Sequence, residues 1–242
     1  MDFMNKIMVV SGANSGIGKS VSELLIDKGA IVIGLDIKNN SIIHERYKHY
    51  RIDIRNEQDI IGAINEIADI YGRIDGLANC AGIFSNSKPF YNLSVDEWNN
   101  VISTNLTGMF LVSKHTAIKM IEKRNGRIVN ISCIRSRVFK PEMADYAASK
   151  GGVVALTSAM ALDLSRFNIR VNSVAPGFTY TGMTAASFDN QQIRELSESI
   201  IPIGKIADPQ EIANVVLFLL SDLSNYINGE TIFVDGGFKI SK

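Results

Sequence analysis

The chain is poor in the residues that build disulfide frameworks and metal centres. Only two of its 242 residues are cysteines, Cys80 and Cys133, which is too few for a disulfide scaffold and is typical of a reducing compartment. Its three histidines show no spacing that suits a metal ion, so we expect no catalytic metal. They are His44, His49 and His115.

Net charge and long apolar runs are lacking as well. The 25 basic and 25 acidic side chains give a formal net charge of zero, and no basic stripe suggests a nucleic-acid partner. The longest apolar runs, such as VVLFLL at 215–220, are too short to cross a membrane, and the N-terminal run is too short for a signal peptide. We therefore expect a cytoplasmic protein without a membrane partner.

Short apolar runs alternate along the chain with longer segments of helical periodicity. The apolar runs are nearly continuous, which is typical of parallel strands buried on both faces. This alternation predicts an α/β fold: a Rossmann-like, doubly wound, parallel seven-stranded sheet flanked by helices on both faces, in a single domain over residues 1–242. The predicted strands are 6–10, 30–36, 49–53, 74–80, 126–132, 169–175 and 231–235, and the predicted helices are roughly 17–28, 57–71, 95–123, 145–167 and 209–222.

The stretch 176–206 is the only long segment predicted to be irregular. It follows a predicted strand, and open α/β sheets bind their ligands beyond the carboxyl ends of strands. We therefore predict that 176–206 forms a mobile lid over a substrate.

The stretch SGANSGIG at 11–18 joins the first predicted strand to the first predicted helix. Its glycines, Gly12, Gly16 and Gly18, permit a tight turn and let the backbone approach a pyrophosphate, which the free N–H groups of the helix would bind. The placement between a strand and a helix predicts a dinucleotide site. The other predicted contacts within this loop are Asn14, Ser15 and Ile17.

Two aspartates end the next two predicted strands. Asp36 can accept hydrogen bonds from the adenosine ribose of NAD and would repel the 2′-phosphate of NADP, so NAD is the predicted cofactor. Lys38 is the only nearby cation that would weaken this preference. Asp53 and Ile54 are predicted to flank the adenine.

Tyr146 and Lys150 lie four residues apart in a predicted helix and therefore share one face. An ammonium group near the tyrosine hydroxyl would lower the pKa of that hydroxyl from its usual value of about 10. A tyrosine tuned in this way can exchange a proton with an alcohol oxygen while a nicotinamide exchanges hydride with the adjacent carbon.

Several motifs follow one another in an order that resembles the short-chain dehydrogenase/reductase family over nearly the whole chain, in its NAD(P)-dependent single-domain form. Besides the glycine loop and YAASK at 146–150, these are NCAG at 79–82, STNLTG at 103–108 and PGFTYT at 176–181. The closing residues from IPIGKIADPQEI onward are similar to the C-terminal helix and strand of the family. The further cofactor contacts that the resemblance implies are Asn79, Ala81, Gly82, Pro176, Gly177, Thr179 and Thr181, with Tyr146 and Lys150.

The resemblance implies an oxidoreductase that transfers hydride between NAD(H) and a small-molecule secondary alcohol or ketone. It implies that Tyr146 is the acid/base, that Lys150 lowers the pKa of this tyrosine and bonds the nicotinamide ribose, and that Asn105 holds a water linking Lys150 to solvent. It also implies a homotetramer. The alternative is a catalytically weak NAD-binding sensor or scaffold.

Cys133 is the one departure from the pattern of the family. The catalytic serine of the family usually lies 13 residues before the tyrosine, and Cys133 occupies that position. Cys133 can donate a weak S–H hydrogen bond in its place; or a local shift lets Ser132 or Ser136 serve; or catalysis is lost or changed. The unaltered interval favours Cys133, and Ser132 should face the other side of its strand.

Three cations, Arg135, Arg137 and Lys140, lie between Cys133 and Tyr146. The resemblance places this loop beside the substrate, where the cations can receive a carboxylate or a phosphate. A solvated loop or a subunit contact is an alternative of equal weight.

Overall fold

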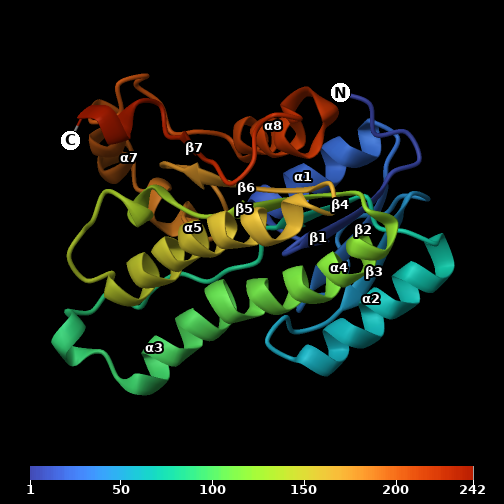
Figure 1. The fold of residues 1–242 in the computed structure, drawn as a ribbon. Helices are drawn as coiled ribbons and strands as arrows, with labels where there is room; N and C mark the ends of the chain where they lie inside the picture. Colours follow the sequence, from blue (N-terminus) through green and yellow to red (C-terminus); the bar gives the residue numbers. More distant parts are fainter. Residues whose placement is uncertain (242) are drawn as a thin grey trace.

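A parallel sheet of seven strands forms the centre of the molecule, which this computed structural model describes over residues 1–241 (Figure 1). The strand order is β3-β2-β1-β4-β5-β6-β7, so the chain builds one half of the sheet outward from β1 and then crosses to build the other half from β4. The predicted Rossmann-like α/β fold is confirmed. The strands are β1 Ile7–Ser11, β2 Ile31–Asp36, β3 Tyr47–Arg51, β4 Gly76–Asn79, β5 Gly126–Ile131, β6 Ile169–Pro176 and β7 Thr231–Val234.

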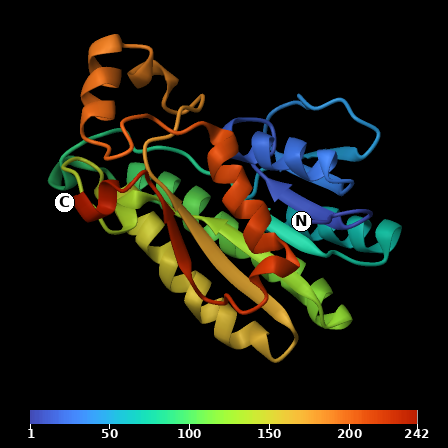
Figure 2. The same cartoon turned by 90° about the horizontal axis from the view of Figure 1, so that it is seen from above.

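Helices cover both faces of the sheet, as predicted. On one face α1 (Gly16–Asp27) and α8 (Pro209–Leu220) pack side by side (Figure 2). The other face is covered by α2 (Glu57–Tyr71), α4 (Met109–Lys123) and α5 (Ala144–Ser165). Because helices lie on both sides, the inner strands β1, β4 and β6 are buried along their whole length.

The edge strand β3 differs from the prediction in place and in character. It begins at Tyr47 rather than at residue 49, because its parallel pairing with β2 starts where Tyr47 meets Val32. Its sequence, YKHYR, is mostly half-buried rather than apolar. An edge strand pairs on one side only, so polar and aromatic side chains are tolerated there.

The predicted helix 95–123 is one helical path with a wider turn inside it. It starts as α3 (Val95–Ile102), which begins with a capping box. A π-helical turn at Ser103–Gly108 then leads into α4. Turns of this kind are frequent at functional sites, and this one carries Asn105, which is fully buried.

The stretch 176–206 is not irregular throughout, which corrects the prediction. It contains two helices, α6 (Ala185–Phe188) and α7 (Gln191–Ser199). The sequence pattern misses them because they are only 4 and 9 residues long, too short to show a helical period. A small apolar core of its own holds the segment together, formed by Phe178, Phe188, Ile201 and Ile206.

Membrane-spanning helices and metal clusters are both absent from residues 1–241. None of the helices in this range is both long and apolar enough to cross a bilayer. Histidine, cysteine and carboxylate side chains of the same range nowhere gather in a group of three that could hold a metal ion.

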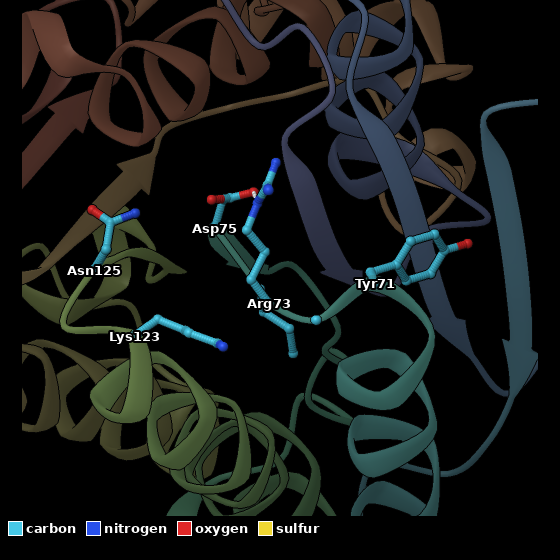
Figure 3. A pocket seen from close by; sticks show the side chains of 7 residues that line it. Tyr71, Arg73, Asp75, Lys123 and Asn125 are labelled. Carbon is cyan, nitrogen blue, oxygen red and sulfur yellow. Dashed lines mark hydrogen bonds and ion pairs between the residues drawn. The ribbon is translucent and has the colours of Figure 1, made fainter.

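Asp75 ties the segment before β4 to the start of β1, at the amino ends of the strands (Figure 3). Its carboxylate accepts a hydrogen bond from the backbone N–H of Ile7 at 2.8 Å and pairs with Nε of Arg73 at 2.9 Å. These residues border a pocket of about 420 Å³, with Lys123 on its other side. The pocket lies where α2 and α4 end, and the negative ends of two helix dipoles disfavour an anion there. It is also remote from the carboxyl ends of the strands, where such sheets bind ligands.

We expect Asp75→Ala to lower the free energy of unfolding by about 1–3 kcal/mol, because the change leaves the buried N–H of Ile7 without its partner. The matched change Arg73→Ala should cost less than about 1 kcal/mol, because the arginine side chain is half exposed. Urea unfolding followed by circular dichroism measures both variants. Equal losses would contradict the supporting role of the carboxylate.

Candidate active site

The predicted cofactor loop lies at the carboxyl end of β1, against the turn that follows β4. Gly12 has a φ of +70°, and a Cβ added there would lie 2.7 Å from the backbone of Ala81. Only glycine therefore lets the two segments approach this closely. A Cβ at Gly18 would overlap the carbonyl oxygen of Gly12. The strand order reverses between β1 and β4, which is where open sheets bind their ligands.

The first turn of α1 leaves its backbone donors available at this place. The helix begins at Gly16, and its cap residue Ser15 makes no side-chain hydrogen bond to it. Such free N–H groups, at the positive end of the helix dipole, suit a pyrophosphate. Ile17 packs partly buried against the core and anchors the turn.

The segment after β6 borders the same cradle. Pro176 is the last residue of β6, and Gly177 lies against the backbone of Asp235. Thr179 is buried in the wall. Thr181 reaches the glycine loop, because a Cβ added at Gly16 would lie 3.2 Å from the Cβ of Thr181.

Asp36 holds a negative charge beside the glycine loop. The residue is 8% exposed, and its carboxylate accepts hydrogen bonds from the backbone N–H groups of Asn14 at 3.0 Å and Lys38 at 2.9 Å. The side chain of Asn14 in turn bonds to the carbonyls of Lys38 and Asn39 and to the N–H of Ser41. The short connection from β2 to β3 is therefore tied onto the glycine loop.

Asp53 and Ile54, just after β3, each have a partner within the protein. Arg55 pairs with Asp53 at 2.6 Å, and this hydrogen bond lowers the pKa of the Asp53 carboxyl. Ile54 is buried against Gly108 of the π-helical turn. The Asp53 carboxylate keeps partial exposure, so of the two side chains it is the one open to a further hydrogen bond.

The side chain of Asn79, a predicted cofactor contact, is hydrogen-bonded within the sheet and its covering helices. Its side-chain amide donates to Oγ of Ser113 at 2.8 Å and to Oδ1 of Asn130 at 2.9 Å, and Asn130 donates onward to Thr157. Asn79 ends β4 with its side chain directed toward β5 and α4, so its amide cross-links the layers. The backbone that follows it, at Ala81, forms the face of the cleft.

Asn105 locks the chain after β4 to two helices. Its Oδ1 accepts the N–H of Ile83 at 2.8 Å, and its amide donates to the Ile83 carbonyl at 2.9 Å and to Oγ of Ser149 at 3.3 Å. A Cβ added at Gly82 would lie 3.1 Å from Oδ1 of Asn105 and 3.7 Å from Nζ of Lys150. Asn105 and Lys150 therefore border one corner of the cleft.

Helix α5 presents Tyr146 and Lys150 on one buried face, 7% and 4% exposed. Nζ of Lys150 donates to the Ile131 carbonyl at 2.8 Å and lies 5.8 Å from the centroid of the Tyr146 ring. Cys133, two residues beyond the end of β5, lies close enough to the Tyr146 hydroxyl to raise its pKa. The fold thus joins the predicted tyrosine, lysine and cysteine in one cluster.

Burial and neighbouring groups oppose each other at the tyrosine. Burial raises the pKa of the Tyr146 hydroxyl well above its usual range, Cys133 raises this pKa further, and the positive charge of Arg135 lowers it. Burial also lowers the pKa of the Lys150 ammonium. The prediction named Lys150 as the tuning cation. In the protein alone that ammonium faces the Ile131 carbonyl, and the opposing charge at the tyrosine is that of Arg135.

The two serines near Cys133 are engaged elsewhere. Oγ of Ser132 donates to the backbone carbonyl of Lys150 at 2.9 Å. Oγ of Ser136 donates to the Cys133 carbonyl at 2.8 Å and closes a local turn. The geometry therefore favours Cys133 over either serine as the group beside the tyrosine.

Phe84 and Ser149 also border the cluster, although the sequence analysis did not single them out. The Phe84 ring lies 5.0 Å from the Tyr146 ring and remains 43% exposed, so it forms an open wall. Oγ of Ser149 donates to the Tyr146 carbonyl at 2.8 Å. Ser149 was detectable, because it lies in YAASK one residue before the lysine. No motif marks Phe84.

The glycine cradle, the fixed charge of Asp36 and the buried Tyr146–Lys150 pair define a Rossmann-type α/β protein that fits a dinucleotide beside a proton-exchanging side chain. Residues 12–239 match a family model described as enoyl-(acyl carrier protein) reductase. The 3-oxoacyl-[acyl-carrier-protein] reductase FabG of Vibrio harveyi is 37% identical over 243 residues, which are 98% of this chain and 98% of that protein.

Solved structures of several dehydrogenases and reductases are similar to this chain over nearly its whole length. The aldohexose dehydrogenase of Thermoplasma acidophilum matches with a TM-score of 0.93 and 32% identity, over 98% of this chain and 95% of its own. ElxO, solved with NADP bound, matches with a TM-score of 0.92 and 27% identity, over 99% of this chain and 100% of its own. The chain belongs to the short-chain dehydrogenase/reductase family, and it is an oxidoreductase of the kind that uses a nicotinamide cofactor.

Proposed function

We propose that this protein is an NAD(H)-dependent oxidoreductase that interconverts a secondary alcohol and a ketone, with Tyr146 as its acid/base. The observation that carries the proposal is the placement of Tyr146 and Lys150 on one buried face of α5, at the same end of the sheet as the glycine cradle. A nicotinamide, when bound, supplies or accepts the hydride at the reacting carbon.

Each polar group of the cluster then has a role in the reaction. Tyr146 exchanges the proton of the substrate oxygen. Because the pKa of its hydroxyl is raised, it stays protonated at neutral pH, which suits donation to a ketone oxygen, whereas alcohol oxidation requires it to lose that proton. Cys133 holds the same oxygen through a weak S–H hydrogen bond. Lys150 binds the nicotinamide ribose, and Asn105 holds a water that links Lys150 to solvent protons.

Several substrate classes are consistent with this chemistry. The relatives named as 3-oxoacyl-[acyl-carrier-protein] reductases support a 3-oxoacyl thioester. The structural neighbour named as an aldohexose dehydrogenase supports a sugar or polyol. A hydroxy acid and a cyclic diol complete the set of secondary alcohols that the open wall at Phe84 would admit.

A catalytically weak NAD-binding sensor or scaffold is the rival function. Its single support is Cys133 at the position of the usual serine. Against it stands the burial of Lys150 next to Tyr146. Binding NAD would account for Lys150 at the nicotinamide ribose, but it does not require a buried tyrosine hydroxyl on the same helix face.

Tyr146→Phe should lower kcat for alcohol oxidation by about 10²- to 10⁴-fold, because the acid/base is removed. NADH should still bind, since the glycine cradle is intact. Ultraviolet absorbance of NADH across a panel of alcohols measures the first effect, and NADH fluorescence measures the second. A variant that kept most of its activity would eliminate Tyr146 from this role.

Cys133→Ser provides the matched pH experiment. Oxidation rates should rise with pH as the Tyr146 hydroxyl loses its proton, and the midpoint should move to lower pH in the variant, because Cys133 contributes to raising the pKa of the tyrosine. Turnover by the serine variant alone would favour the sensor or scaffold instead.

We infer NAD rather than NADP as the cofactor, from the fixed charge of Asp36 beside the glycine cradle. The bound NADP of the structural neighbour ElxO means that the fold alone does not decide this choice. The carboxylate can accept the ribose hydroxyls and repels a 2′-phosphate. With its two free cysteines, we also infer a cytoplasmic location.

Asp36→Ser should raise the ratio of kcat/KM for NADP over NAD by about tenfold or more, because one charge-assisted contact is lost and one repulsion is removed. Asp53→Ser is the matched control. It should affect both cofactors alike, since the adenine is common to them. Steady-state kinetics with each cofactor gives the ratio. An unchanged ratio in Asp36→Ser would refute this assignment.

We further propose a homotetramer, supported by large apolar side chains on two separate surfaces. Light scattering coupled to size exclusion should give about four times the chain mass of 26.6 kDa, and a monomer at micromolar concentration would rule the assembly out. Exposed apolar side chains occur on α4 and α5 and around β7, at Phe110, Ile118, Leu162, Leu223, Tyr226 and Ile240.

A further inference from the structure

Of the three cations between Cys133 and Tyr146, one differs from the other two in its burial and in its electrostatic effect on Tyr146. Arg135 is half-buried, whereas Arg137 and Lys140 are exposed. Arg135 is also the cation whose charge acts on the Tyr146 hydroxyl. The structure therefore separates three residues that the sequence left equivalent.

The backbone that carries Arg135 is held firmly. A single 3₁₀ turn, Ile134–Ser136, follows Cys133. Ser136 donates to the Cys133 carbonyl through both its N–H, at 3.0 Å, and its Oγ, at 2.8 Å. Ile134 is 3% exposed and Ser136 is 6% exposed, so both neighbours of Arg135 are anchored in the protein. The arginine stem consequently starts from a fixed point beside the thiol.

The positive charge of Arg135 has no carboxylate partner in residues 1–241. Its Nη1 donates to the Val138 carbonyl at 3.2 Å, and none of the ion pairs in this range includes it. Asp145, the nearest buried carboxylate along the chain, accepts the N–H of Tyr146 instead. A guanidinium has five donors in a planar fork, so most of its hydrogen-bonding capacity stays available for a ligand.

We propose that Arg135 binds a carboxylate of the substrate, so that the preferred substrate is a short-chain hydroxy acid or oxo acid with the carboxylate next to the reacting carbon or one carbon beyond it. A substrate oxygen bonded to Tyr146 and Cys133 brings that carboxylate to the guanidinium fork, whose planar geometry matches it. The Phe84 ring also borders the Tyr146 ring, at 5.0 Å between centroids. This inference rests on the proposed oxidoreductase function.

In the reaction, the C–H bond of the hydroxy acid breaks and its electron pair leaves as hydride to the oxidised nicotinamide. Tyr146 first loses its own proton to solvent and then accepts the hydroxyl proton as the C=O bond forms, and the oxo acid remains with its carboxylate on Arg135. A 3-oxoacyl thioester carries no charge near its ketone and would leave the guanidinium unpaired. The class proposed here is therefore distinguishable from the one that the relatives suggest.

Substrate pairs that differ only in charge test the proposal. We would compare 3-hydroxybutyrate with its methyl ester, and lactate with methyl lactate, in wild type, Arg135→Gln and Arg137→Gln. We expect wild type and Arg137→Gln to favour the acids in kcat/KM by about tenfold or more, through the charge-assisted pair. Arg135→Gln should lose this preference mainly through KM, and Arg135→Lys should restore part of it.

A binding measurement keeps the test decisive if neither pair turns over. Acetoacetate and methyl acetoacetate are titrated calorimetrically into wild type and Arg135→Gln, each saturated with NADH. Tighter binding of the acid in wild type, lost in Arg135→Gln, supports the proposal. Equal binding of acid and ester in wild type, or a preference that survives in Arg135→Gln, overturns it and leaves the oxidoreductase function standing. Failure of wild type to bind NADH would overturn the proposed function and this inference together.

Discussion

The close approach of the glycine loop to the turn after β4 is the constraint on which the rest of the site depends. Gly12, at φ +70°, lets the end of β1 pass the backbone of Ala81 where any side chain would collide. The cradle therefore forms where the strand order reverses, between β1 and β4. It is bordered by the first turn of α1 and by the segment 176–181. The residues proposed to bind the cofactor surround this contact.

Desolvation and a neighbouring positive charge have opposite effects on the pKa of the Tyr146 hydroxyl. Burial makes the Tyr146 hydroxyl a weak acid, and the thiol beside it adds to that effect. A serine would give a stronger hydrogen bond than Cys133 does. Two residues after Cys133 lies Arg135, whose positive charge lowers the pKa of the Tyr146 hydroxyl. In our proposal the guanidinium of Arg135 both lowers the pKa of the Tyr146 hydroxyl and binds the carboxylate of the substrate. The presence of Cys133 and the choice of substrate are then connected through one residue.

Relatedness determines the chemistry of the family but not the substrate of this chain. At 37% identity to a 3-oxoacyl-[acyl-carrier-protein] reductase and 32% to an aldohexose dehydrogenase, the chain shares one scaffold with proteins of different named substrates. In such folds specificity resides in the loops beyond the strand ends. Here those loops carry Phe84, Arg135 and the helices α6 and α7, and they deserve more weight in choosing a substrate than overall similarity.

The sequence by itself determined the sheet, the glycine cradle and the Tyr146–Lys150 face, because buried parallel strands, tight turns and helical spacing each leave a local pattern. It did not reveal the helices at 185–199, which are too short for a period, or the inward turn of Asn79, which depends on Ser113 and Asn130 from distant segments. The interval to Tyr146 already favoured Cys133 over Ser132 and Ser136, and the tertiary structure added the hydrogen-bond partners of the two serines. The difference in burial among Arg135, Arg137 and Lys140 is visible only in the folded chain. Adjacent residues look alike in a sequence, whereas burial and hydrogen-bond partners are set by elements that only the folded chain brings together.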